Sequence, residues 1–187
     1  MSIVDDGMLQ GNYRAVMEEL RMDTGAGLMH PVVSAELLED VSVRAVFEQY
    51  GIEFEFYGDE ATSRGGHERG PSPMRYFLSG IAFCMLGWYA KGSAFTGCDI
   101  EALAMDVRSF LDMRGEHGFK DRAIHPQWLV LDVRVTSPSP PDQILAMIDW
   151  GDARCPLGVF VRRAVPVYEV VTHNEKIIRD DVPDDLA

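Results

Sequence analysis

Three cysteines, Cys84, Cys98 and Cys155, are the side chains of this sequence best suited to covalent chemistry. A cysteine reacts as its thiolate, which forms where a positive charge or the free N–H groups of a helix N-terminus lie nearby. Cys155 precedes Pro156, a residue type that favours the first position of a helix. Its sulfur is therefore expected to face unpaired N–H groups and to favour the thiolate. Cys98 is predicted to be an ordinary structural thiol.

Cys84 needs a cation from another part of the chain. It lies about three turns into a predicted helix that begins at Pro73, counted at about 3.6 residues per turn. The field of a helix terminus fades within the first turn. The arginines that could supply the charge are Arg44, Arg69 and Arg75. Without such a partner Cys84 would be a buried and inert thiol, since free cysteine is among the most buried residue types.

The other candidate ligands do not form a metal or cofactor site. The five histidines lack the spacing of a zinc or iron site, and the cysteines form no Cys-x-x-Cys pair. We therefore expect no metal and no cofactor. His67 precedes the predicted helix, where it is either a solvated loop residue or part of a site. Aromatic side chains of the helix either fill the core or line an apolar pocket beside Cys84: Phe77, Phe83, Trp88 and Tyr89.

The composition is that of a soluble globular protein of 187 residues, with 47% hydrophobic and 25% charged residues. A formal net charge of -13 repels phosphate backbones and anionic lipids, so we expect neither nucleic acid nor membrane partners. The longest apolar run, residues 76–90, is shorter than the roughly 20 residues of a membrane span. The first residues lack the features of a secretory signal. We therefore predict a cytoplasmic protein with reduced thiols.

The pattern of apolar residues predicts an α+β fold in three parts. Residues 1–40 are expected to form a helical N-terminal extension, with one helix capped by Asn12 and a second over residues 34–38. Residues 41–171 form the predicted main domain, and residues 172–187 a solvated acidic tail. The elements predicted for the main domain are a hairpin over 41–57, a helix over 74–91 ending at Lys91 and Gly92, strands over 100–110, 128–136 and 165–171, a helix that begins near Ser139, and a short turn or helix that begins at Pro156.

The helix predicted over residues 74–91 is apolar on nearly every face. A helix of this kind must be buried on all sides. We therefore expect that it runs through the centre of the domain or that a second subunit covers it.

Five short motifs follow one another along residues 41–171: Gly70-Pro71-Ser72-Pro73, Ser79-Gly80-Ile81-Ala82-Phe83-Cys84, Asp112-Met113-Arg114-Gly115, Arg154-Cys155-Pro156 and Val165-Pro166-Val167. Their order and spacing resemble the OsmC/Ohr family. The resemblance implies an OsmC-like fold, with curved antiparallel sheets wrapped around long central helices in an intertwined homodimer. It also implies a cofactor-free peroxidase that reduces organic hydroperoxides at the dimer interface and is recycled by a thiol reductant.

The resemblance also assigns roles to single residues. Cys84 would be the peroxidatic cysteine that attacks the hydroperoxide, and Cys155 the resolving cysteine that closes a disulfide. The family's catalytic arginine comes from the N-terminal hairpin, where Arg44 is the nearest candidate. Contacts with an apolar substrate are expected from residues in and just before the central helix: Phe77, Ile81, Trp88 and His67.

Met74 departs from the family pattern, because peroxidase members carry a glutamate at this position. The loop before the helix offers Glu68 and Arg69 as substitutes. The departure leaves two other functions open. The chain could bind or transform another small apolar molecule on the same scaffold, with residues 1–40 reshaping the pocket. It could also be a structural or interaction protein whose cysteines are incidental.

Overall fold

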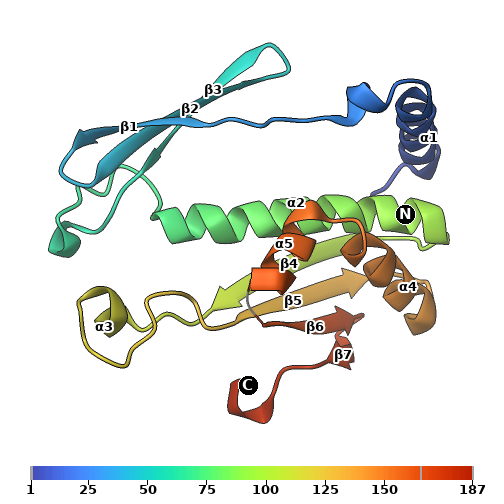
Figure 1. Cartoon of the computed structure of the whole chain (residues 1–187). Helices are drawn as coiled ribbons and strands as arrows, with labels where there is room; N and C mark the ends of the chain where they lie inside the picture. Colours follow the sequence, from blue (N-terminus) through green and yellow to red (C-terminus); the bar gives the residue numbers. More distant parts are fainter. Residues whose placement is uncertain (1, 165, 187) are drawn as a thin grey trace. The chain divides into compact units, whose positions relative to one another are not determined.

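The computed structural model describes residues 2–164 and 166–186, which form two compact units. One unit holds residues 18–78, and the other combines the residues up to Met17 with those from Ser79 onward. The helices are α1 (Asp6–Met22), α2 (Pro73–Thr96), α3 (Met113–Glu116), α4 (Pro141–Asp152) and α5 (Pro156–Ala164). The strands are β1 (Ser34–Glu39), β2 (Ser42–Gln49), β3 (Ile52–Gly58), β4 (Ala102–Ser109), β5 (Leu129–Thr136), β6 (Val167–His173) and β7 (Lys176–Asp180) (Figure 1).

The unit of residues 18–78 contains an antiparallel sheet in the order β1-β2-β3. The predicted hairpin over 41–57 is confirmed as β2 and β3. These strands are joined at Tyr50 and Gly51, whose φ angles of 59° and 70° suit a tight turn. The helix predicted over 34–38 is wrong, because this segment is β1 and pairs with β2. Pairing with a neighbouring strand overrides the local preference of so short a segment.

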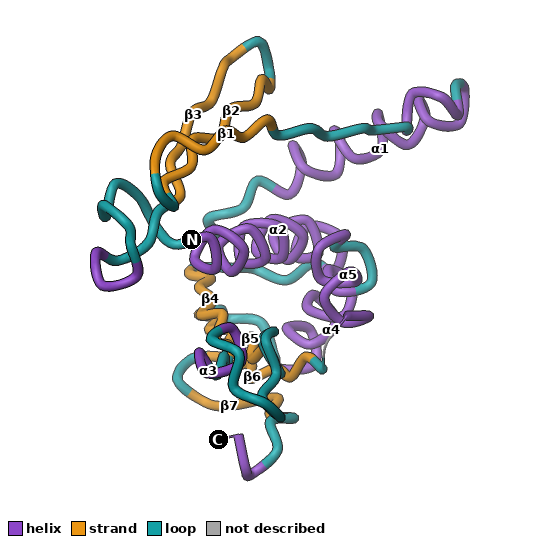
Figure 2. Tube along the Cα trace, turned by 60° about the vertical axis from the view of Figure 1, so that its left-hand side comes forward, coloured by secondary structure: helices purple, strands orange, loops and turns teal. Residues whose placement is uncertain are grey.

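The other unit is built on a sheet in the order β4-β5-β6-β7. The strands predicted over 100–110 and 128–136 are confirmed as β4 and β5, which pair antiparallel. β6 lies parallel to β5, so the chain needs a crossover between them, and α4 and α5 form that crossover. Figure 2 shows both helices beside α2. Because β5 is a central strand, residues from both of its faces are buried, including Val130 and Leu131.

Part of the segment predicted as an acidic tail, residues 172–187, belongs to the sheet. β6 continues to His173, and β7 pairs with it antiparallel. The strand predicted over 165–171 begins at Val167, and Val165 lies outside the described residues. Charged side chains are typical of an edge strand, which explains how an acidic segment can belong to the sheet.

The central helix is longer than the sequence pattern predicts. Gly92 was expected to end it, but α2 continues to Thr96 and is followed by Gly97 with a φ angle of 71°. Gly92 instead lets α2 and α4 approach closely, since a β-carbon there would lie 2.7 Å from the carbonyl oxygen of Met147. The glycine that looked like a cap is therefore a packing residue.

Within one chain, α2 is buried on one side rather than on every side. Ile81, Met85 and Tyr89 are at most 1% exposed and face the core. Phe83 points the other way and is 75% exposed. Among the described helices, none is both long enough and apolar enough to cross a membrane.

The N-terminal helix also begins earlier than predicted. The carboxylate of Asp5 accepts a hydrogen bond of 2.9 Å from the backbone N–H of Met8, so Asp5 caps α1 and Asn12 does not. Tyr13 packs against the rings of Phe95 and Trp150, with centroids 4.9 and 5.8 Å apart. These contacts tie the first turns of α1 to the unit that holds the cysteines.

Candidate active site

The fold brings two of the three cysteines together. Sγ of Cys84, in the middle of α2, lies 3.2 Å from Sγ of Cys155, at the start of α5. Both are free thiols. A disulfide needs a sulfur–sulfur distance of about 2.05 Å, so a small side-chain movement separates this arrangement from a covalent bond. Cys155 is fully buried and Cys84 is half-buried.

Cys155 caps the N-terminus of α5. Its carbonyl oxygen accepts a hydrogen bond of 2.9 Å from Val159, and its sulfur accepts one of 3.2 Å from the backbone N–H of Gly158. Pro156 occupies the first helical position. The prediction that this sulfur faces free N–H groups is confirmed.

The predicted preference of Cys155 for the thiolate is wrong in this resting arrangement. Burial raises the pKa of the Cys155 thiol to about 11, because a charged sulfur loses its hydration. The N–H group of Gly158 acts in the opposite direction, while the neighbouring sulfur of Cys84 raises the pKa further. The hydrogen bonds from the N-terminus of α5 are therefore outweighed, and the resting thiol keeps its proton.

Close packing of α4 against α2 fixes the position of this pair. A β-carbon on Gly151 would lie 2.5 Å from a ring carbon of Tyr89, so only glycine allows the two helices to come this near. The hydroxyl of Tyr89 donates a hydrogen bond of 2.8 Å to Asp152. Burial raises the pKa of Tyr89, so this hydroxyl stays protonated. The end of α4, and with it the start of α5, is thus held one to two turns from Cys84.

A cluster of charged side chains adjoins the start of α5, and no sequence pattern indicated it. Nη2 of Arg162 on α5 bonds to Asp152, at 2.9 Å, and to Glu169 on β6. Arg179 on β7 bonds to the second oxygen of Glu169, at 2.7 Å, and to Asp149. These residues come from four elements and share no spacing that a sequence pattern could reveal.

Glu169 is the most buried member of this charge cluster, with a side chain that is 5% exposed. Burial, followed by the nearby carboxylate of Asp152, raises the pKa of Glu169 to about 7. The guanidinium groups of Arg162 and Arg179 oppose this change. The cluster therefore contains a carboxyl group that changes charge near neutral pH.

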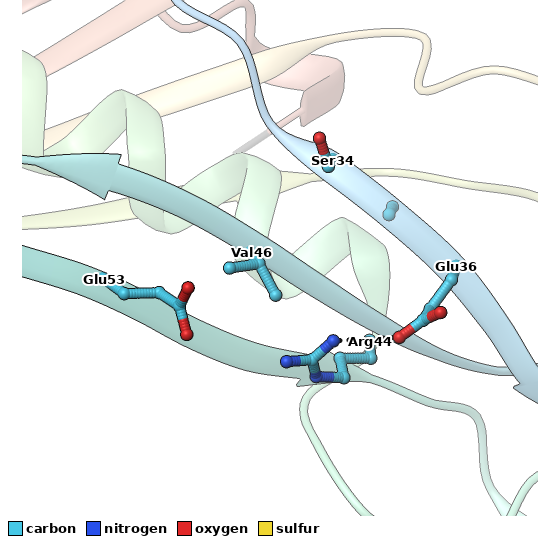
Figure 3. A pocket seen from close by; sticks show the side chains of 6 residues that line it. Ser34, Glu36, Arg44, Val46 and Glu53 are labelled. Atoms are coloured by element: carbon cyan, nitrogen blue, oxygen red, sulfur yellow. Dashed lines mark hydrogen bonds and ion pairs between the residues drawn. The ribbon is translucent and has the colours of Figure 1, made fainter.

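Arg44, the candidate arginine from the hairpin, is held by two carboxylates of its own sheet. Its guanidinium bonds to Glu55 at 2.6 and 2.8 Å and to Glu36 at 2.9 Å. These hydrogen bonds, of which that to Glu55 has the largest effect, raise the pKa of Arg44, so its guanidinium stays positively charged. Figure 3 shows Arg44 and Glu36 facing one another at a cavity of about 420 Å³ whose lining includes Val46 and Glu53. All of these residues belong to the unit of residues 18–78.

The loop candidates are likewise engaged within the unit of residues 18–78. Arg69 pairs with Glu39, and Nε2 of His67 lies 3.0 Å from a carboxylate oxygen of Asp40. Glu68 accepts hydrogen bonds of 3.2 and 3.1 Å from the backbone and the hydroxyl of Thr62. These contacts organise the segment that leads into α2, and none of them involves a thiol.

Asp59 is the centre of this loop, and sequence reasoning missed it. Its buried carboxylate accepts a hydrogen bond of 2.6 Å from Ser42 and others from the backbone N–H groups of Glu60, His67 and Arg69. These hydrogen bonds, that of Ser42 foremost, hold the pKa of Asp59 well below its usual range. An aspartate before a glycine-rich loop was the available signal, since its side chain readily binds the backbone of such turns.

Replacement of Asp59 by alanine is expected to loosen this loop. Amide hydrogen exchange at His67 and Arg69 should become at least about tenfold faster, because their N–H groups lose a charged acceptor. In the unchanged protein, strongly acidic pH should also speed amide exchange in this loop relative to its intrinsic rate, because Asp59 becomes protonated. A carboxyl whose pKa is depressed stabilises the fold above its ordinary pKa of about 4 and loses this effect as the pH falls. Equal exchange in both proteins would show that Asp59 does not order the loop.

The residues predicted to contact a substrate have different environments. Ile81 is 1% exposed and fills the core, so it cannot line an open pocket. Trp88 is half-buried, 6.0 Å from the ring of Trp150 and with Nζ of Lys91 4.2 Å from its ring centroid. Phe77 is exposed. The third thiol, Cys98, is buried apart from this pair, with its sulfur 3.9 Å from the carbonyl oxygen of Asp99.

The sequence and the fold are both similar to those of known proteins. The family model described as OsmC-like protein matches residues 65–169. The solved OsmC-like protein from Mycoplasma pneumoniae is 22% identical, with a TM-score of 0.65 over 78% of this chain and 97% of that one. The organic hydroperoxide resistance protein OsmC from Legionella pneumophila is 15% identical, with a TM-score of 0.59 over 78% and 98% of the two chains.

An organic hydroperoxide resistance protein from Elizabethkingia anophelis, solved with bound thiocyanate, is also similar. It is 13% identical, with a TM-score of 0.60 over 79% of this chain and 99% of that one. No curated protein matches the chain. At these identities, the solved structures establish a shared α+β fold with a long central helix.

Proposed function

This chain belongs to the OsmC-like protein family, and on that premise we propose that it reduces organic hydroperoxides through Cys84 and Cys155. The observation that supports the proposal is the distance of 3.2 Å between the two sulfurs. Relatives with the same fold are named organic hydroperoxide resistance proteins. Two thiols that meet from separate helices are the minimum that a two-cysteine peroxidase requires.

The reaction would proceed in two steps on these sulfurs. The thiolate of Cys84 attacks the outer oxygen of the hydroperoxide, the O–O bond breaks, and the alcohol leaves after taking up a proton. Cys84 is then a sulfenic acid. The sulfur of Cys155 attacks the sulfur of Cys84, so that a disulfide forms and the hydroxyl group leaves as water. A thiol reductant would return two electrons and restore both thiols.

Arg44 is our candidate for the cation that activates Cys84, with Arg69 as the alternative. The resemblance assigns this role to an arginine of the hairpin, and Arg44 lies on β2 of that hairpin. Met74 stands where the family glutamate would hold the arginine, but Glu36 and Glu55 already bind the guanidinium of Arg44. We infer that these two carboxylates replace the missing one. Glu68 would then serve only to order the loop, through its hydrogen bonds with Thr62.

A homodimer would explain the exposed apolar side chains of α2 and α5. Phe83 and Phe160 are 75% and 61% exposed, and Leu157 is 40% exposed, which is costly for a monomer in water. A second copy laid across these helices would bury them and would complete the burial predicted for the central helix. We propose Phe77, Trp88 and His67 as the residues of such a dimer that would contact an apolar substrate.

Oxidation of the Cys98→Ser protein with one equivalent of cumene hydroperoxide tests the function. We expect a disulfide between Cys84 and Cys155, seen by mass spectrometry as the loss of two hydrogens and a cross-linked pair of peptides. The Cys84→Ser/Cys98→Ser protein is the matched control and should form no such cross-link. Two free thiols after this treatment would contradict the proposal.

Binding of another small apolar molecule is the second candidate. It is favoured by Met74 and by the protonated resting state of Cys155, whose burial raises its pKa. The same oxidation separates the two candidates, because a binding protein would leave the hydroperoxide unconsumed.

A further inference from the structure

Arg162 presents an unused hydrogen-bond donor inside the unit that holds the thiols. Its Nη2 atom bonds to Asp152 and Glu169, but its Nη1 atom is buried and has no hydrogen-bond partner among the described residues. Buried donors are nearly always paired in native proteins, so an unpaired one on a charged group points to a missing acceptor.

The unpaired atom and the sulfur of Cys155 both border Gly158. A β-carbon built on Gly158 would be 3.2 Å from Nη1 of Arg162 and 3.4 Å from Sγ of Cys155. One methyl group would therefore touch both atoms. Gly158 thus leaves open a point that borders both the guanidinium and the thiol, and a positive charge within about 6 Å favours a thiolate.

We propose that Arg162 stabilises the thiolate of Cys155 while this residue resolves the oxidised Cys84. The inference rests on the proposed function, and it concerns a cation from α5 rather than from the hairpin. When Cys155 attacks the sulfenic acid, its proton leaves with the hydroxyl group of Cys84 as water, and the sulfur becomes negative as the S–H bond breaks. Nη1 of Arg162 is already in place at that moment, because two carboxylates hold the other side of the guanidinium.

The groups around Cys155 act on its charge in opposite directions. The backbone N–H groups of Gly158 and Leu157 favour the thiolate, while burial and the sulfur of Cys84 disfavour it. The proposal adds Arg162 to the groups that favour it. Behind Arg162 lie the other charged and titratable members of the cluster, contributed by α4, β6, β7 and α2: Asp149, Asp152, Glu169, Arg179 and Tyr89. Removal of a positive or a negative member should therefore move the Cys155 pKa in opposite directions.

The test is a titration of Cys155 as the single thiol, in the Cys84→Ser/Cys98→Ser protein. The ultraviolet absorbance of the thiolate is followed with pH, and the protein that also carries Cys155→Ser provides the baseline for tyrosine. Arg162→Gln should lower the fraction of thiolate at mildly alkaline pH about tenfold. Arg163→Gln removes the same charge from the next, exposed position and should titrate like the parent. Arg162→Lys should restore part of the thiolate.

Glu169→Gln decides between an electrostatic and a structural effect. At alkaline pH Glu169 carries a negative charge, so its removal should increase the thiolate fraction of Cys155. A general loosening of the site would not change the thiolate fraction in opposite directions in Arg162→Gln and Glu169→Gln.

If Arg162→Gln does not fold, Gly158→Ala adds a methyl group that would touch both Nη1 and the sulfur, and it should lower the thiolate fraction with every charge retained. Equal titration of Arg162→Gln and Arg163→Gln, or a change of the same sign in Glu169→Gln, would overturn the proposal. Because no peroxide is used, the titration decides on Arg162 even if the hydroperoxide experiment fails.

Discussion

Replacement of Cys84 by serine is expected to lower hydroperoxide consumption at least about a thousandfold. A serine hydroxyl is hardly ionised at neutral pH and cannot form a sulfenic acid, so the first step of the reaction is lost rather than slowed. The rest of the site should be undisturbed, since serine is nearly isosteric and Cys84 is half-buried. The measurement is the steady-state rate of cumene hydroperoxide loss in the presence of excess dithiol.

Cys155→Ser separates the two cysteines by their roles. Without added thiol, this protein should consume about one equivalent of hydroperoxide and then stop as the sulfenic acid of Cys84, which dimedone would trap. Cys98→Ser should behave like the unchanged protein, because Cys98 is buried away from the pair. Normal turnover by Cys84→Ser would exclude Cys84 as the peroxidatic residue.

Replacement of Glu169 by alanine is expected to lower the free energy of unfolding by about 3–5 kcal/mol above neutral pH. The change removes the buried carboxylate that Arg162 and Arg179 share, and leaves each half-buried guanidinium with one carboxylate partner. Urea unfolding followed by circular dichroism measures the effect. Asp149→Asn is the matched control, because this carboxylate also binds Arg179 but is 66% exposed, and exposed pairs contribute less than about 1 kcal/mol. Equal losses in the two variants would show that burial is not the cause.

Glu169→Gln isolates the pH dependence of the same residue. The pKa of Glu169 is raised to about 7 in the folded protein, while an unfolded glutamate titrates near about 4.3. Between these values the folded state binds the additional proton, so stability from this group is present at lower pH and is lost as the pH rises toward 7. Relative to Glu169→Gln, the unchanged protein should therefore lose about 3 kcal/mol of its free energy of unfolding as the pH rises across this window. A difference that does not depend on pH would contradict the assignment.

The local elements of the fold were largely predictable, because their signals lie in neighbouring residues. Alternating apolar residues indicated β2, β3, β4 and β5, and prolines marked the starts of α2, α4 and α5. The errors have a common origin in tertiary contacts. Ser34–Glu39 is a strand because β2 lies beside it, and Gly92 is helical because α4 packs on it.

The candidate site was predictable in part. The two thiols are 71 residues apart in sequence, and no local pattern could bring them together, so their pairing came from the resemblance alone. Neither the local sequence pattern nor the family resemblance predicts the charge cluster. Arg162, Glu169 and Arg179 become neighbours only through the parallel pairing of β5 with β6 and the turn into β7. Helix and strand periodicity contain no information about such contacts.

The close approach of α2 and α4 also limits how the thiol pair can work. With Gly92 and Gly151 pressed against the opposite helix, neither helix can slide along the other without a clash. The change between dithiol and disulfide must then be made by rotation about the side-chain bonds of Cys84 and Cys155. An oxidation cycle of this kind would leave the backbone nearly unchanged and would therefore send no large conformational signal to the surface of the protein.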